Sequence, residues 1–101
     1  VYVGAKGPSL ATEGVASPIS DPAIYVVNGT TGALVGSLND NWADGADAEK
    51  LTEIGRAPTA TEDAALILRD LTPGPYSAVA YGIGDVSGTV LVEVYEVDLG
   101  E

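Results

Sequence analysis

Short runs of apolar residues, separated by turn residues, recur along the whole chain. The runs are rich in valine, isoleucine, leucine and tyrosine, and β-branched and aromatic residues favour the half-buried surface of a sheet. The last run alternates, with Val92 and Val94 on one face and Glu93 and Tyr95 on the other. The pattern predicts six short strands, at residues 1–3, 23–27, 33–37, 64–69, 76–81 and 89–97.

The segments between these runs carry the residues that turns and loops need. Asn28-Gly29 separates two apolar runs and predicts a hairpin, and Thr72-Pro73-Gly74-Pro75 predicts a turn before the fifth strand. Residues 9–22 are rich in serine, proline and glycine and predict a loop. Only residues 47–55 indicate a helix, of one or two turns, with Asp47 as its N-cap and Gly55 at its end.

These elements together predict the fold class. Six or more short strands with turn chemistry between them are typical of a sandwich or jelly roll. We therefore expect an all-β protein, an antiparallel β-sandwich or jelly roll of about six to eight short strands with at most one short helix. A length of 101 residues corresponds to one domain, spanning residues 1–101.

The composition excludes several kinds of chemistry. The chain has no cysteine and no histidine, so it has no disulfide, no thiolate nucleophile and no Ser-His-Asp triad. Carboxylates such as Glu62, Asp63, Glu93 and Glu96 could pair for glycoside hydrolysis, but a solvated face is the preferred explanation in so small a chain. No nucleophile with an adjacent base can be named. The chain is therefore predicted not to be an enzyme.

The charge balance bears on partners. Fifteen acidic residues against four basic ones give a net charge of −11, which repels nucleic-acid phosphates and anionic lipid headgroups. No apolar run reaches the roughly 18–20 residues that span a bilayer. We therefore expect no nucleic-acid partner and no membrane insertion. The same surface attracts divalent cations, for which the chain offers oxygen ligands only.

The densest group of such oxygens predicts a calcium site. Calcium takes six to eight oxygens, and a loop of alternating carboxylates and carbonyls can wrap one ion. The candidate Ca²⁺ ligands are Asp40, Asp44, Asp47, Asn39 and Asn41. Asp85, in a glycine-rich loop, could join them. The alternative is that these residues are turn formers that cap the short helix.

Aromatic and amide residues suggest contacts with glycans. Trp42 is the candidate glycan contact, because it is the one aromatic residue in a predicted loop, where ligands usually bind. The alternative is that the aromatic residues belong to the core or pair across strands. Asn28-Gly29-Thr30 fits the acceptor pattern for N-glycosylation, but a hairpin turn explains the same residues and is preferred.

Several segments in order resemble a known module. The matching segments are Gly7-Pro8-Ser9-Leu10, Asp21-Pro22-Ala23-Ile24, Thr31-Gly32-Ala33-Leu34, Asn39-Asp40-Asn41-Trp42, residues 71–79 and residues 87–96. Together they resemble a β-sandwich module of secreted and cell-surface proteins of environmental, Verrucomicrobia-like bacteria. They are more distantly similar to bacterial pre-peptidase C-terminal domains, which are jelly rolls with surface calcium sites. The resemblance implies a fold and an extracellular or cell-surface location, and it implies no enzymatic activity.

One departure from the module suggests how the protein functions. Copies of the module carry a further strand or two before the segment matching Val1-Tyr2-Val3, so the resemblance implies that the chain is either trimmed or receives a strand from elsewhere. Because the first residue is valine and no basic or apolar leader segment stands before it, we expect the chain to be a processed or excised part of a secreted protein. Val1, Tyr2 and Val3 are therefore the candidate self-association residues, in a model of strand addition at an open edge.

The sequence thus predicts a non-enzymatic extracellular structural protein. It would be a subunit or module of a self-associating surface filament, tube or layer, a homo-oligomer or polymer that calcium could stabilise. Residues 1–3 and 90–97 are expected to be paired in sheets, and strand addition would pair one of them with a neighbouring chain. The alternative is a carbohydrate-binding accessory module of a larger secreted protein, with polysaccharide as its partner.

Overall fold

The computed structural model describes residues 1–84 and 87–100 and contains six strands and three short helical segments. The strands are β1 (Tyr2–Lys6), β2 (Pro22–Asn28), β3 (Leu34–Asn39), β4 (Ala64–Ile67), β5 (Tyr76–Gly82) and β6 (Leu91–Tyr95). The helical segments are the 3₁₀ helices η1 (Pro8–Glu13) and η2 (Trp42–Asp44) and the α-helix α1 (Ala48–Glu53). No helix in these residues is long and apolar enough to cross a membrane.

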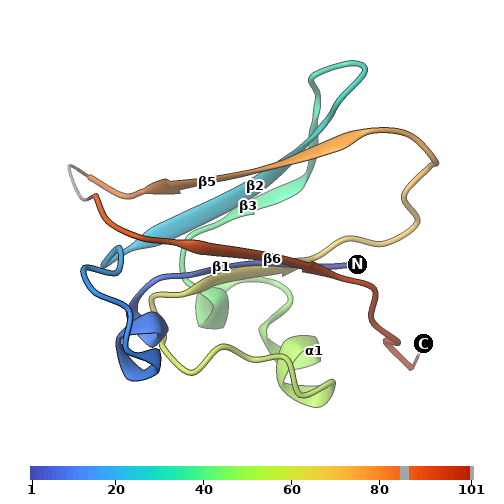
Figure 1. Cartoon of the computed structure of the whole chain (residues 1–101). Coiled ribbons are helices and arrows are strands. Elements are labelled where there is room, and N and C mark those ends of the chain that lie inside the picture. Colours follow the sequence, from blue (N-terminus) through green and yellow to red (C-terminus); the bar gives the residue numbers. More distant parts are fainter. Residues whose placement is uncertain (85–86, 101) are drawn as a thin grey trace.

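The strands form two antiparallel sheets of three strands each. One sheet has the order β4-β1-β6 and the other has the order β3-β2-β5. The sheets lie face to face, and the helical segments lie on the other side of the first sheet (Figure 1). The chain is therefore the expected all-β antiparallel sandwich, with six strands and a helical layer added to one face.

A first apolar core lies between the two sheets. Val3 and Ala5 of β1 face Ile24 and Val26 of β2, and all four are buried. The closest contacts between the sheets join β1 with β2, β2 with β4, and β3 with β4. The sheets therefore pack tightly along the side formed by β3 and β4.

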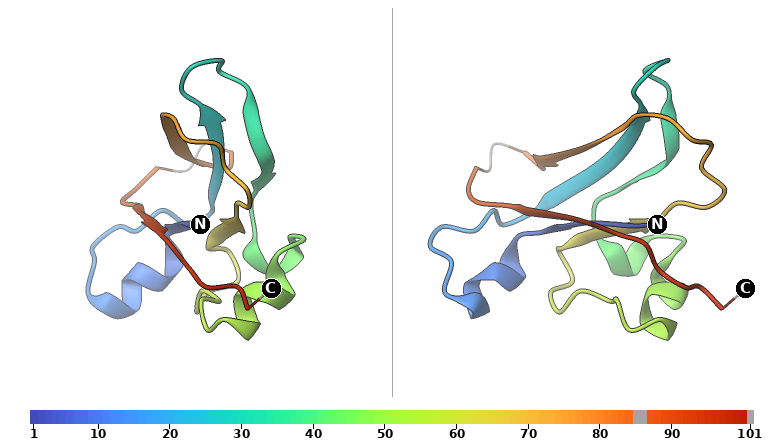
Figure 2. Two further views of the ribbon diagram at one scale, coloured as in Figure 1. Left: turned by 90° about the vertical axis from the view of Figure 1, so that its right-hand side faces the viewer. Right: turned by 45° about the vertical axis from the view of Figure 1, so that its right-hand side comes forward.

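A second core lies between the first sheet and the helical layer. Here Tyr2 of β1, together with Ala65 and Ile67 of β4, packs against Leu51 of α1. Side views show the helical segments gathered beneath this sheet (Figure 2). Successive residues of β1 thus point into different cores, as the alternation of side chains along a strand requires.

The predicted elements agree closely with the observed ones. All six predicted strands are present, and the α-helix begins after Asp47 and is followed by Gly55, whose φ is +74°. Two details differ. Residues 9–22 contain the 3₁₀ helix η1, and the Asp47 side chain does not cap α1. In the predicted hairpin, the Asn28 side chain accepts hydrogen bonds from the amides of Thr30 and Thr31, at 2.8 and 3.1 Å.

A buried carboxylate connects β1, η1 and β4. Asp63 is fully buried, and its Oδ1 accepts a hydrogen bond from the Gly7 amide at 2.9 Å and a longer one from the Ser9 amide at 3.5 Å. The Asp63 carbonyl accepts a further bond from the Trp42 amide at 2.9 Å. Asp63 therefore ties the first 3₁₀ helix and the segment after β3 to the start of β4.

A close backbone approach sets the start of β6. Thr89 exchanges hydrogen bonds with the segment around Pro18, since its amide donates to Ser17 and its carbonyl accepts from Ile19, at 2.9 and 2.8 Å. A Cβ at Gly88, whose φ is +150°, would lie 2.7 Å from the Ser17 carbonyl oxygen. Position 88 therefore requires glycine, and the strand that follows is anchored there.

Replacing Asp63 tests the first of these anchors. Asp63→Ala leaves buried backbone amides without an acceptor, which costs about 1–3 kcal/mol of unfolding free energy. Asp63→Asn keeps an oxygen in the same place and should cost less. Urea unfolding of the two variants and the wild type measures the difference. Equal destabilisation by both substitutions would contradict the role given to the hydrogen bonds.

Candidate functional site

The predicted calcium ligands lie around η2 and the start of α1, but two of them are committed to β4. The Asn39 side-chain oxygen accepts a hydrogen bond from the Ala65 amide at 3.0 Å, and its Nδ2 donates to the Asn41 carbonyl at 3.2 Å. Asn39 is also largely buried. Its side chain therefore completes the hydrogen bonding of a strand edge and does not point into a ligand-binding loop.

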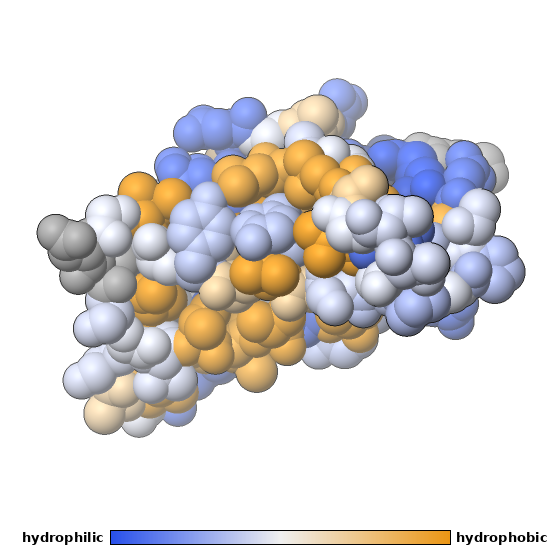
Figure 3. All heavy atoms as spheres, turned by 90° about the horizontal axis from the view of Figure 1, so that it is seen from above, coloured by the Kyte–Doolittle hydropathy of each residue, from blue (hydrophilic) through white to orange (hydrophobic). Residues whose placement is uncertain are grey.

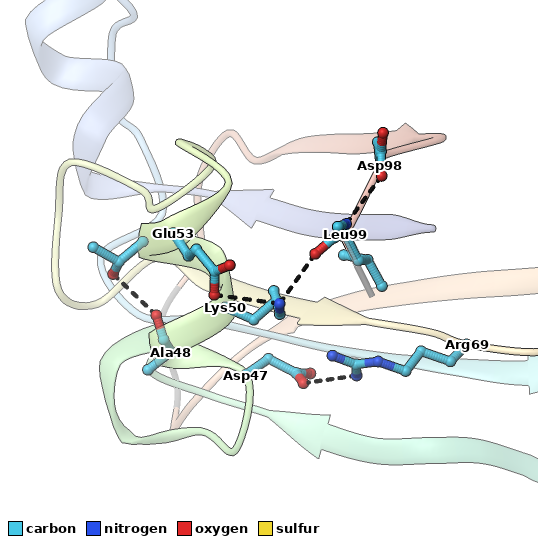
Figure 4. Close-up of polar contacts among 9 residues, drawn as sticks. Asp47, Ala48, Lys50, Glu53, Arg69, Asp98 and Leu99 are labelled. Atoms are coloured by element: carbon cyan, nitrogen blue, oxygen red, sulfur yellow. Dashed lines mark hydrogen bonds and ion pairs between the residues drawn. The ribbon is translucent and has the colours of Figure 1, made fainter.

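The Asp47 side chain also accepts a hydrogen bond from the edge of β4, two residues further along the strand. One of its carboxylate oxygens accepts a hydrogen bond from the Ile67 amide at 2.9 Å, and the other lies 3.4 Å from the Arg69 guanidinium. Figure 4 shows this pair beside α1, where Lys50 contacts Glu53 and the Leu99 carbonyl. Asn39 and Asp47 thus satisfy alternate amides along the outer edge of β4.

Asp40 has a different neighbour, which the sequence analysis missed. Partial burial raises the pKa of Asp40, and a hydrogen bond with the Asp21 carboxyl and the charges of Asp21 and Asp44 raise it further. Asp21 precedes β2 and lies 19 positions before Asp40 in the chain, so no local pattern could have paired them. Two carboxyls in contact favour a shared proton.

Of the five predicted ligands, Asn39 and Asp47 bind β4, and Asp44 is exposed. Asp40 faces Asp21, and the Oδ1 atoms of Asp40 and Asn41 are buried without a hydrogen-bond partner among the described residues. Within residues 1–84 and 87–100, no three acidic side chains are placed to share a metal ion. Asp85 lies outside the described residues. Calcium binding stays a prediction, and the function proposed below does not depend on it.

Trp42 is anchored at the edge of the second core. Its indole N–H donates to the Ala60 carbonyl at 3.1 Å, and its ring is partly buried against that core. The ring is thus held from two sides, as expected for the alternative interpretation of the aromatic residues as core residues. A glycan contact at Trp42 stays a prediction, limited to the part of the ring that solvent reaches.

Val1, Tyr2 and Val3 lie at the middle of the first sheet. Tyr2 and Val3 pair with β4 on one side and with β6 on the other, and Val1 exchanges backbone hydrogen bonds with Leu68 at 2.8 and 2.9 Å. Tyr2 and Val3 are also buried. Tyr2 and Val3 therefore have no free edge to offer to a neighbouring chain, and Val1 is paired on the β4 side.

A partly exposed apolar surface lies along the side where β5 and β6 lie. Val92 and Val94 of β6 are opposite Ala5 and Val3 in the register and so face the space between the sheets. Yet Val92 is 40% exposed and Val94 is 57% exposed, whereas Ala5 and Val3 are 0% and 2% exposed. Inward-facing side chains on this strand therefore remain in contact with solvent.

The second sheet explains this exposure. The residues of β5 that face inward are opposite Ile24 and Val26 and are the alanines Ala80 and Ala78. These side chains are too small to cover the valines of β6. We call the surface formed by Ala78, Ala80, Val92 and Val94 the open seam. Figure 3, which is coloured by residue hydropathy and seen from above, shows hydrophobic residues in several groups on that face, with more polar residues between them.

The opposite face of β6 is polar and aromatic. Tyr95 stacks on Tyr2 with ring centroids 5.9 Å apart, and the Arg56 guanidinium lies 5.1 Å from the Tyr95 centroid. The Tyr95 hydroxyl donates to Glu93 at 2.5 Å, and Glu93 forms an ion pair with Lys6 at 3.4 Å. The sequence showed the alternation of β6 but not that Arg56 would lie over it.

Comparison with known proteins adds no relative. No protein-family model, curated protein or solved structure matches the chain. The resemblance to the cell-surface β-sandwich module and to pre-peptidase C-terminal domains therefore stays a prediction. The function has to be argued from the geometry.

Removing the charge of Asp40 tests its contact with Asp21. Because the pKa of Asp40 is raised in the folded state, its contribution to stability is present below the ordinary value of 3.8 and is lost as pH rises through the folded pKa. Asp40→Asn stays neutral at every pH. At about pH 3.5, below the pKa of Asp40 in both the folded and the unfolded state, the melting temperature of the variant should match that of the wild type. At pH 7 it should exceed the wild-type value by about 2–4 °C.

Glu49→Gln is the matched control, because Glu49 is exposed on α1 and the substitution removes the same charge. It should change the melting temperature little at either pH. Adding calcium chloride to the same melts tests the metal prediction. A calcium-dependent rise in the wild type that Asp40→Asn abolishes would show that the carboxyl pair binds the ion.

Proposed function

We propose that the protein is a non-enzymatic, extracellular structural module that self-associates by strand addition at β6. The observation that supports this is the contrast within one register: Val94 is 57% exposed while Val3 beside it is 2% exposed. A strand with inward-facing valines and a solvent-facing edge is a template for pairing with another chain. An added strand would continue the first sheet and bring apolar side chains over the open seam.

The two edges of the first sheet favour β6 as the point of addition. The outer amides of β4 at Ala65 and Ile67 already donate to Asn39 and Asp47. Within the described residues, no backbone hydrogen bond reaches the outer edge of β6 between Leu91 and Tyr95. Side-chain capping protects one edge of the sheet and leaves the other available.

The charge distribution supports a second copy as the occupant. Each chain carries a net charge of −11, so two copies repel each other over most of their surfaces. The open seam consists of alanine and valine and carries no charge. Contact through this surface buries apolar area and keeps the acidic surfaces of the two copies apart.

Antiparallel pairing of two β6 strands about a two-fold axis fits this sequence. A register centred on Val92 places Val94 of one copy opposite Val90 of the other, so that the residues on the inward face are all valines. The same register keeps the two Glu93 side chains from facing each other, and like charges directly opposite are destabilising. The outcome is a six-stranded sheet shared by two copies.

A contact of this kind closes on itself. Because each copy offers the same surface, pairing at β6 produces a dimer, and growth into a filament, tube or layer needs a second contact elsewhere on the molecule. The proposed dimer is thus the building unit of such an assembly. The extracellular location is proposed on the grounds of the resemblance to secreted and cell-surface modules noted above.

A charge placed in the open seam should prevent association. Val94→Lys puts an ammonium group where a second copy would bring apolar side chains, while the high exposure of Val94 means that the fold loses little stability. Sedimentation velocity over a range of concentrations should show a dimer for the wild type and a monomer for the variant. Association of the wild type should strengthen as sodium chloride screens the net charge.

Leu34→Lys is the control, because Leu34 is 55% exposed, lies in a strand and gains the same charge. It should leave the dimer intact. A wild type that stays monomeric at all concentrations overturns the proposal. So does a loss of association that is equal in Leu34→Lys and Val94→Lys, since association would then not depend on the seam.

A further inference from the structure

The face of β6 opposite the open seam forms the wall of a pocket. The pocket has a volume of about 250 Å³ and lies between the outer face of β1 and β6, the helix η1 and the segment that follows α1. Tyr2, Lys6, Glu93 and Tyr95 line it from the sheet, and Ser9 and Arg56 line it from the other two segments. This volume is slightly below the roughly 300–1,000 Å³ of drug-sized sites, which suits one small ring.

The charges in the pocket are balanced. Lys6 and Arg56, half of the four basic residues in the chain, line it together with Glu13 and Glu93. An anionic ligand would lie near two carboxylates, and a cationic ligand would lie near two cations. The pocket therefore favours a neutral ligand that both accepts and donates hydrogen bonds, although the chain as a whole is strongly acidic.

The donors and acceptors in the pocket are held in place. Stacking on Tyr95 fixes the Arg56 guanidinium, which forms no hydrogen bond or ion pair with any described residue. Burial, together with the charges of Glu93 and Asp63, raises the pKa of Tyr2 to about 12. The Tyr2 phenol therefore stays protonated and remains a hydrogen-bond donor at neutral pH.

A buried hydroxyl at the edge of the pocket is unsatisfied. Ser9 is only 6% exposed, and its hydroxyl has no hydrogen-bond partner among the described residues. Buried polar groups are nearly always paired with protein, water or ligand. Ser9 lines the pocket, so a ligand hydroxyl or a water molecule within it can satisfy this group.

We propose that this pocket binds one neutral hexopyranose unit of a polysaccharide. Arg56 donates to ring hydroxyl oxygens, Glu93 accepts from hydroxyl groups, and Tyr2 and Ser9 contact the inserted edge of the sugar. A sugar ring matches the pocket in size, in neutrality and in its dense, mixed hydrogen-bonding groups. The site is separate from Trp42, which does not line the pocket.

This site is independent of the association proposed above. Glu93 and Tyr95 point to the pocket, whereas Val92 and Val94 point to the open seam on the opposite face of the sheet. A monomer could therefore bind a sugar, and a dimer would carry two such pockets. Failure of one proposal leaves the other standing, and Val94→Lys should retain the affinity for the sugar.

Titrations followed by amide NMR shifts test the pocket. The probes are the methyl glycosides of glucose, galactose and mannose, with glucuronate as the anionic probe and glucosamine as the cationic one. We expect one neutral glycoside to shift residues of β6, η1 and the segment after α1, with a Kd on the order of 1 mM. Arg56→Ala and Glu93→Gln should each weaken binding by about tenfold or more.

Glu96→Gln is the matched control, because it changes the same chemistry on an exposed residue that does not line this pocket. It should bind the glycoside as the wild type does. No shifts from any neutral glycoside, or stronger binding of glucuronate or glucosamine, would overturn the assignment of a neutral sugar. Shifts centred on Trp42 and lost only in Trp42→Ala would overturn the assignment of the pocket.

Discussion

The structure depends on the strand Tyr2–Lys6, which is satisfied on both edges and packed on both faces. Its backbone pairs with β4 and with β6, and its side chains alternate between the core that separates the sheets and the core beneath the helical layer. Gly4 allows this, because the Tyr2 ring lies over it and a Cβ at that position would overlap the Tyr2 hydroxyl. Five residues therefore hold three layers together.

The two neighbours of this strand show opposite ways of ending a sheet. All four residues of β4 are buried, because the segment from Asn39 to Asp47 folds over its edge and supplies acceptors to its amides. Among the described residues, no segment forms backbone hydrogen bonds with the outer edge of β6, and small residues on β5 leave its inward face partly in solvent. Asn39 and Asp47, two of the residues that suggested a metal site, thus protect one edge of the sheet, and the opposite edge is the one proposed to bind a partner.

The sequence predicted the elements well because their signals are local. Apolar runs, the Asn28-Gly29 pair and the glycine after α1 each act over a few residues, and the observed strands and helix follow them. The strand pairings could not be predicted, because β1 pairs with residues more than fifty positions away. The hydrogen bonds of Asn39 and Asp47 to the edge of β4 depend on those pairings, so sequence spacing alone could not reveal them.

The same reasoning applies to the two surfaces of β6. Its alternation was visible in the sequence, but the exposure of its apolar face depends on the alanines of β5, and its polar face acquires Arg56 only through the fold. Neither surface of β6 could therefore be predicted from local sequence patterns.

The anchor at Gly88 has a consequence for both faces of β6. Side chains alternate along a strand, so a shift of β6 by one residue against β1 would exchange its faces completely. The valines would then enter the polar pocket, and Glu93 and Tyr95 would enter the space between the sheets. The close approach of Gly88 to Ser17 and Ile19 fixes the register of β6. Position 88 belongs to neither the open seam nor the pocket. A side chain there would nevertheless displace β6 and so change both surfaces at once.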